Sequence, residues 1–182
     1  IHLLRREPRA AIPYTERLAT LVAEHTLTAM QPWSQVLSGV QQASLGETHA
    51  GTTRVRRGMA AWAETGARTG RTFQMLLLVD LYREQGALDA AAQVLDEGLA
   101  LIDETGEHIL EAEFRRLRGE VALAQGADAA DVERTLRGAL ALARAQSAGA
   151  WVSRASLSLA RFLRCQGRTE EAQLLAVSFN AP

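Results

Sequence analysis

Glycine recurs along the chain at a nearly constant interval, and this interval constrains the fold more than any other feature of the sequence. Four glycines each end a segment of helix-like composition and lie 40, 40 and 41 residues apart: Gly46, Gly86, Gly126 and Gly167. Glycine is common just past a helix end because it adopts the left-handed conformation at no steric cost. A second set of segments ends midway between these positions, at Gly66, Gly106 and Gly149. One period is therefore two helices joined by short turns, and such a period is typical of a solenoid.

The apolar residues and the composition agree with an all-α chain. Residues 71–86, 88–105, 109–125 and 132–148 are expected to be helices, because their apolar residues recur every three or four positions. No proline occurs between Pro32 and Pro182, so this part of the chain lacks the strongest helix breaker. Hydrophobic residues make up 47% of the sequence, which is too many for a disordered chain.

The period divides the chain into a repeat array with short tails. A second-type helix, the kind that ends a pair, is expected first, at 13–30. Three full pairs follow, and then a first helix at 150–166 with a partial partner from residue 169. The sequence thus predicts a right-handed α-solenoid of about eight helices. The predicted domain limits are 1–12 for an N-terminal tail or the end of a preceding region, 13–178 for the array, and 179–182 for a C-terminal tail.

One position of the first helix in each pair carries a small residue. It is occupied in successive periods by Gly39, Val79, Gly119 and Ala160. Small side chains let two helices approach closely. We expect Gly119 to be buried at such a contact because Leu117 and Val121 flank it, and a leucine in its place would overpack the contact.

Composition excludes several classes of function. The net charge of −1 lacks the basic excess with which proteins bind nucleic acids or membrane surfaces directly. The longest aliphatic run, Met75 to Val79, is too short to cross a membrane. A single cysteine, Cys165, allows no internal disulfide, which fits a reducing cytosol. We therefore expect a cytoplasmic protein, with Cys165 as a buried or half-buried small residue.

The sequence contains no motif for catalysis, for a metal or for a cofactor. The chain has no lysine, so a Walker A phosphate loop is excluded. The histidines are scattered and do not have the spacing of metal ligands. Glu104 and His108 are four residues apart, but we expect Gly106 to break the helix between them and His108 to be a solvated loop residue.

The glycine-centred period resembles the tetratricopeptide repeat (TPR), although the usual length of that repeat is 34 residues. Residues 60–67 (Ala-Ala-Trp-Ala-Glu-Thr-Gly-Ala), 105–120 and 155–176 also resemble the C-terminal helical-repeat region of bacterial multidomain signalling proteins. In those proteins the array follows a P-loop ATPase module, which in turn follows a class III nucleotide cyclase or a DNA-binding regulator domain. The resemblance implies a regulatory domain that binds proteins or senses ligands and has no chemical activity of its own. An alternative is a structural spacer that holds an attached ATPase or cyclase module autoinhibited.

In TPR arrays the first helices line the concave face, so the resemblance also implies a binding surface. Charged residues are expected there at seven positions: Arg83, Glu113, Arg116, Glu120, Arg154, Arg161 and Arg164. These residues have two interpretations. In the first, Glu113 and Glu120 face the row formed by Arg154, Arg161 and Arg164 on the next first helix. The resulting ladder of salt bridges would set the register between repeats. Alternatively, the arginines bind carboxylate or phosphate groups of a ligand or peptide.

Both ends of the array carry apolar residues with little polar cover. They are Ile1, Leu3 and Leu4 at the start, and Ala172, Leu174, Leu175, Val177 and Phe179 at the end. Exposed apolar surface at the end of a solenoid favours association. We expect the isolated chain either to form a homodimer through a terminal helix or to keep its ends frayed. Because residue 1 is Ile rather than Met, we expect a longer protein, in which the N-terminal end docks on the preceding ATPase module.

Overall fold

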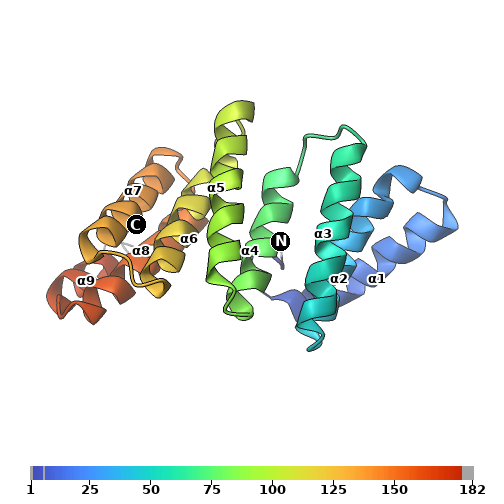
Figure 1. Cartoon of the computed structure of the whole chain (residues 1–182). Helices are drawn as coiled ribbons and strands as arrows, with labels where there is room; N and C mark the ends of the chain where they lie inside the picture. The colour runs from blue at the N-terminus through green and yellow to red at the C-terminus, as the bar shows by residue number, and fades with distance from the viewer. Residues whose placement is uncertain (1, 6, 178–182) are drawn as a thin grey trace. The chain divides into compact units, whose positions relative to one another are not determined.

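A computed structural model describes residues 2–5 and 7–177 of the chain (Figure 1). Helices take up 82% of these described residues, which contain no strand, and the prediction of an all-α chain is confirmed. The residues fall into two compact units, 1–91 and 92–182. No helix in the described part of the chain is both long and apolar enough to cross a membrane.

The helices of unit 1 follow one another as antiparallel neighbours, because the turns between them are short. They are α1 (Pro8–Glu24), the 3₁₀ helix η1 (Thr28–Met30), α2 (Gln31–Ser44), α3 (Thr48–Glu64) and α4 (Arg71–Glu84). In the terms used for the sequence, α2 and α4 are first helices, and α3 is the second helix that pairs with α2. Helix α5 (Leu88–Thr105) begins in unit 1 and continues into unit 2.

Unit 2 continues the same alternation of first and second helices. It contains the 3₁₀ helix η2 (His108–Leu110), α6 (Glu111–Ala124), α7 (Ala129–Ala145), α8 (Gly149–Cys165) and α9 (Thr169–Val177). Its core lies between α7 and α8, where Val132, Leu136 and Leu140 pack against Leu159 and Leu163. The described residues thus form nine α-helices, where the sequence predicted about eight.

The first helix differs from the prediction of 13–30. Helix α1 begins at Pro8 and ends at Glu24, and Pro13 lies inside it. Pro8 is the first residue of the helix, a position that needs no backbone N–H donor. Pro13 sits in the second turn, where its missing N–H removes the bond to the carbonyl of the exposed Arg9, and solvent can satisfy that carbonyl. The chain then leaves the helix at Thr26, which has a positive φ of 51°.

The turns at the four periodic glycines are confirmed, whereas Gly149, which was expected to follow a helix end, begins α8, and Ser147 with a φ of 52° makes the turn after α7. Gly46, Gly86, Gly126 and Gly167 have φ values of 104°, 70°, 79° and 77°. A side chain with a Cβ rarely adopts this conformation, so the spacing of these glycines fixes where the first helices end.

A helix start in unit 2 also differs from its predicted position. Helix α7 covers Ala129–Ala145, whereas the apolar pattern predicted 132–148. Asp128 caps it by accepting hydrogen bonds from the N–H groups of Ala130 (2.9 Å) and Asp131 (3.3 Å). The first apolar residue of the core face, Val132, stands one turn inside the helix, and the cap rather than the apolar face sets the boundary.

Small residues bring the paired helices together as predicted. A Cβ on Gly39 of α2 would lie 2.7 Å from the carbonyl oxygen of Gly51 in α3. A Cβ on Gly119 of α6 would lie 2.8 Å from Cδ2 of Leu136 in α7. Gly119 is buried, so the predicted close contact is confirmed. The two contacts differ in kind, because Gly39 meets backbone and Gly119 meets a side chain.

The ends of the chain are partly covered. Ala172 is buried in the unit 2 core, Leu175 is partly buried against it, and Leu174 is 69% exposed. Leu3 and Leu4 are half-buried. Ile1, Phe179 and the side chain of Val177 lie outside the described residues, and the expected homodimer stays a prediction.

Candidate functional site

The seven predicted binding residues lie on first helices of both units. Arg83 is on α4 in unit 1. Glu113, Arg116 and Glu120 are on α6, and Arg154, Arg161 and Arg164 are on α8, all in unit 2. Each unit therefore presents its own candidate surface.

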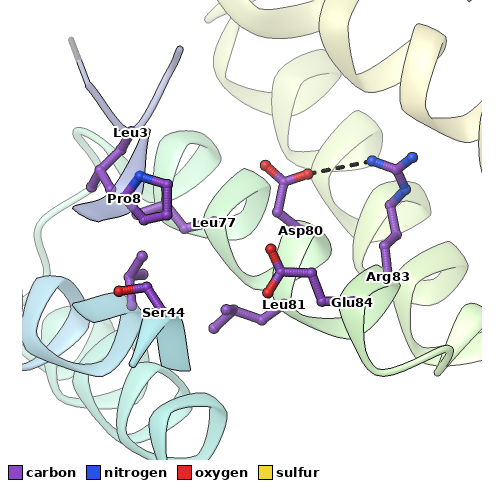
Figure 2. Close-up of a pocket in the computed structure, with 9 residues that line it drawn as sticks. Leu3, Pro8, Ser44, Leu77, Asp80, Leu81, Arg83 and Glu84 are labelled. Atoms are coloured by element: carbon purple, nitrogen blue, oxygen red, sulfur yellow. Dashed lines mark hydrogen bonds and ion pairs between the residues drawn. The ribbon is translucent and has the colours of Figure 1, made fainter. Parts of the chain in front are cut away.

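Unit 1 has a pocket of about 300 Å³ on α2 and α4 (Figure 2). Its floor is apolar, formed by Val40 of α2 with Leu77 and Leu81 of α4. Asp80, Arg83 and Glu84 form a charged rim on one side. Arg83 donates a hydrogen bond of 3.4 Å to Asp80. The pocket thus combines an apolar floor with a rim of mixed charge.

The opposite wall of this pocket comes from the start of the chain. Figure 2 shows Leu3 and Pro8 across from Asp80 and Glu84. Residues 2–5 form a turn, in which the N–H of Arg5 donates to the carbonyl of His2 (3.1 Å). The ring of His2 also contacts the carboxylate of Glu7 (3.0 Å) and stacks on Tyr14 of α1 (5.6 Å between centroids). These contacts hold the segment against α1 beside the pocket.

Unit 2 has a buried charge network on α6 and α8, and a separate pocket of about 420 Å³ that Arg164 helps to line. Arg116 donates two hydrogen bonds to the carboxylate of Glu113, both of 2.7 Å, and one of 2.6 Å to Glu120. It also donates to Oγ of Ser158 on α8 (3.0 Å), and Arg154 of α8 lies 2.8 Å from Glu113. The side chains of Arg116 and Glu113 are each 3% exposed. The network therefore joins α6 to α8 from the inside.

The electrostatics of Arg116 follow from this geometry. Burial alone would lower the pKa of its guanidinium, but the hydrogen bonds and charges of Glu113 and Glu120 outweigh burial and raise that pKa. Arg116 is consequently cationic at every accessible pH. Its side chain was predicted to face a groove, and in the structure it is covered by α8 and its donors are engaged within the protein.

The arginines of α8 differ in accessibility. Arg154 is 24% exposed and lies over the ring of Trp151, 5.5 Å from the centroid. Arg161 and Arg164 are exposed and do not belong to the network. Of the predicted residues, Glu113, Arg116, Glu120 and Arg154 are thus brought together, and Arg161 and Arg164 remain at the surface.

The structure corrects the expectation for Cys165 and only part of that for His108, which is exposed as expected. Cys165 is exposed, because it is the last residue of α8 and lies past the apolar face of that helix. His108 belongs to η2, where its ring contacts Glu111 (2.8 Å). Burial would raise the pKa of Glu111, but its bonds to His108 and Arg115 lower it overall. The described residues contain no cluster of side chains that could hold a metal ion.

Sequence reasoning missed Ser158 and the pocket wall at Leu3 and Pro8. Ser158 stands on the same face of α8 as Arg154 and Arg161, and it is the small polar residue opposite Arg116 in the network. The amphipathic pattern showed no signal for it. The wall at Leu3 depends on how the first residues fold back, which a helical period does not encode.

Comparison with known proteins identifies the fold. No model of a protein family and no curated protein matches the chain. Two solved structures of a kinesin light chain-like protein from Podosopora anserina, with nearly identical TPR-like repeats, are similar to it. One has a TM-score of 0.68 and the other 0.65, at 18% sequence identity, and each covers 98% of this chain and 90% of its own. The chain is therefore an α-solenoid of TPR-like helix pairs.

Proposed function

We propose that this chain is a non-catalytic protein-interaction or ligand-sensing domain of a larger bacterial signalling protein in the cytoplasm. One observation carries the proposal, namely the pocket of about 300 Å³ on the first helices α2 and α4. Its volume suits one or two side chains of a peptide. The apolar floor would bury an aliphatic side chain, and the charged rim would orient the polar groups beside it.

The exposed arginines of α8 form a second proposed binding surface, on unit 2 by itself. Arg161 and Arg164 are accessible, and guanidinium groups bind carboxylates through paired hydrogen bonds. Glu113, Arg116 and Glu120 support this surface by holding α8 and Arg154 in place. The two interpretations of the charged residues are therefore compatible. The buried residues form the salt bridges, and Arg161 and Arg164 remain accessible to a ligand.

A selection of binding peptides tests the proposal at the pocket. A displayed library of random 12-residue peptides is panned on the chain, and the enriched peptides are titrated against Asp80→Asn and Glu84→Gln variants. Loss of one rim charge should weaken binding by about two- to fivefold, as is usual for partly exposed ion pairs. Glu64→Gln is the matched control because Glu64 is exposed at the end of α3 and does not line the pocket. Enriched peptides that bind all three variants equally would place binding elsewhere.

The buried network favours a second candidate function, the structural spacer that holds an attached ATPase or cyclase module autoinhibited. Burying Arg116 and Glu113 stiffens unit 2 and leaves them no contact with a ligand. In the full-length protein, Arg161→Glu should then raise the basal activity of the attached module without changing peptide affinity. The interaction domain predicts the reverse, a change in ligand affinity at constant basal activity.

A further inference from the structure

The helix pair α8–α9 of unit 2 has an open groove where the preceding pair of that unit, α6–α7, holds a helix. Helix α8 covers the α6–α7 pair, because Leu159 packs with Leu136 of α7 and Ser158 accepts a hydrogen bond from Arg116 of α6 (3.0 Å). In the part of the chain that the structure describes, no first helix follows α9. The pocket of about 420 Å³ lies in this groove and is lined by both α8 and α9.

One position of the first helices shows how the two pairs differ. Ten residues before its turn glycine, α2 carries Val36, α6 carries Arg116 and α8 carries Leu157. Val36 is fully buried and Arg116 is 2% exposed, whereas Leu157 is 47% exposed and lines the pocket. Covering an exposed leucine in a groove is favourable, so this position of α8 is suited to contact with a further helix.

The chemistry of the groove indicates what the further helix carries. Ala160 of α8 and Ala172 and Leu175 of α9 line the pocket beside Leu157. Arg164 is the one charged side chain among the described residues that line it. Arg164 is exposed and forms no ion pair with any residue that the structure describes. The groove therefore combines an apolar surface with one free positive charge, which an apolar face and a carboxylate would complement.

We propose that this groove binds an amphipathic helix of a partner protein, in the way that the α6–α7 pair binds α8. The proposal rests on the proposed function and names the class of partner for unit 2. The partner helix presents aliphatic residues, three and four positions apart, to Leu157 and α9, and an acidic residue to Arg164. The lining residues of α8 run from Ser153 to Arg164, about 16 Å at 1.5 Å per residue, so about three helical turns fill the groove.

A second copy of this chain has no first helix to spare for the groove. A first helix packs on the preceding pair through the residue twelve positions before its turn glycine, as Phe114 of α6 does against Gly98 of α5. In the four first helices this position is buried within the chain itself, and it is occupied by Ser34, Gln74, Phe114 and Ala155. A second copy would have to unpack one of these helices, whereas a separate amphipathic helix has its apolar face available.

A peptide copy of α8 tests the proposal, because α8 is a helix that such a groove accepts. Glu113 and Arg154 stand at equivalent positions of neighbouring first helices and form an ion pair, so equivalent positions face each other. The probe is a fluorescent 16-residue peptide with the sequence of residues 150–165. In the probe, Arg164→Glu supplies the carboxylate, the other two arginines are changed to glutamine, and the cysteine is changed to alanine. A hydrocarbon staple between its positions 153 and 157, away from its packing face, keeps the probe helical.

The first measurement is the affinity of this probe for the full chain by fluorescence anisotropy. Leu157→Asp should weaken binding at least about tenfold, because it replaces the apolar contact by a carboxylate that the partner helix would bury. Leu123→Asp is the matched control, since Leu123 is an exposed leucine of α6 that does not line the pocket, and its affinity should equal that of the wild type. Circular dichroism establishes that each variant is folded.

The second measurement exchanges the charges. Arg164→Glu in the chain should weaken binding of the acidic probe by about two- to fivefold, as expected for a partly exposed ion pair. A second probe that keeps its arginine at position 164 should show the opposite preference and bind the Arg164→Glu chain more tightly than the wild type. Arg144→Glu changes an exposed arginine of α7 that does not line the pocket, and it should leave both affinities unchanged.

The proposal is overturned if the acidic probe does not bind, or if it binds the wild type and Leu157→Asp equally. It is also overturned if sedimentation shows a dimer of the chain that Leu157→Asp abolishes, because a second copy then fills the groove. The panned peptides distinguish these failures from a failure of the proposed function. If they lose affinity in Asp80→Asn, unit 1 binds peptides and only the helix site of unit 2 is wrong. If they do not, the proposed function fails as well.

Discussion

At equivalent positions of the repeat, unit 1 carries aromatic side chains and unit 2 carries charged ones. Thirteen residues before their turn glycines, Trp33 of α2 and Phe73 of α4 lie in ring contact, with centroids 6.0 Å apart. The equivalent residues in unit 2 are Glu113 of α6 and Arg154 of α8, which form an ion pair of 2.8 Å. An aromatic pair and an ion pair thus join neighbouring first helices at one position of the repeat. Turn glycines and small residues set the spacing of helices, and the contact between first helices is free to vary in chemistry.

This difference also explains where each unit keeps its accessible surface. In unit 1 the apolar contacts leave charged groups such as Asp80 and Glu84 at the rim of a pocket. In unit 2 the equivalent position to Asp80, six residues before the turn glycine, is Glu120, and it is drawn into the network by Arg116 and Ser158. Polar residues that bond to each other across helices are removed from ligand binding.

Breaking the buried network should have the largest effect. Arg116→Ala leaves the Glu113 carboxylate buried with one partner fewer, and we expect the free energy of unfolding to fall by about 3–5 kcal/mol. Urea-induced unfolding measures this loss. Leu76→Ala, at the equivalent position of unit 1, should cost a similar amount by leaving a cavity.

The two losses differ in how they can be repaired. Adding Glu113→Gln to Arg116→Ala removes the unpaired charge and should recover much of the stability, whereas no neutralising change repairs the cavity at Leu76. If the double variant in unit 2 is as unstable as Arg116→Ala alone, the network is not held together by charge.

The small residues give an effect of intermediate size. Gly39→Ala forces a Cβ against the backbone oxygen of Gly51, which cannot move without shifting α3, and should cost about 2–3 kcal/mol. In Gly119→Ala the Cβ meets the flexible end of Leu136, and the higher helix propensity of alanine offsets part of the strain, so we expect a loss of about 1 kcal/mol or less. Gly119→Leu should cost about 1–3 kcal/mol or more. Thermal unfolding ranks the three variants, and equal costs for both alanine variants would contradict this interpretation.

The smallest effects are expected from breaking the aromatic pair Trp33–Phe73 or the ion pair Glu113–Arg154. Added salt distinguishes the two, because it screens only the ion pair. Trp33→Leu removes the aromatic contact and should cost about 0.5–1.5 kcal/mol beyond lost burial, at any ionic strength. Arg154→Met removes the partly exposed partner of Glu113 and should cost about 1 kcal/mol in dilute buffer and less in 1 M NaCl. Urea unfolding at both salt concentrations measures the difference. A loss on Arg154→Met that salt does not reduce would assign that residue's contribution to packing on Trp151.

Much of the fold could be predicted because its signals are local. A glycine just past a helix end adopts a positive φ at no steric cost, so the positions of Gly46, Gly86, Gly126 and Gly167 indicated the period and the pairs. The sequence pattern misplaced helix starts where a single capping residue or a proline sets the boundary. Asp128 starts α7 one turn before its apolar face, and Pro13 is tolerated inside α1.

The sequence by itself determined the helices, their pairing and the small contacts at Gly39 and Gly119, because each depends on residues close in the chain or on a repeated period. Only the tertiary structure decided which charges are used inside the protein. Arg116 and Arg161 look alike in sequence, yet one is buried between α6 and α8 and the other is exposed. Whether a charge is desolvated depends on which helix covers it, and Ser158 and Leu3 acquire their roles only from the neighbours that folding brings to them.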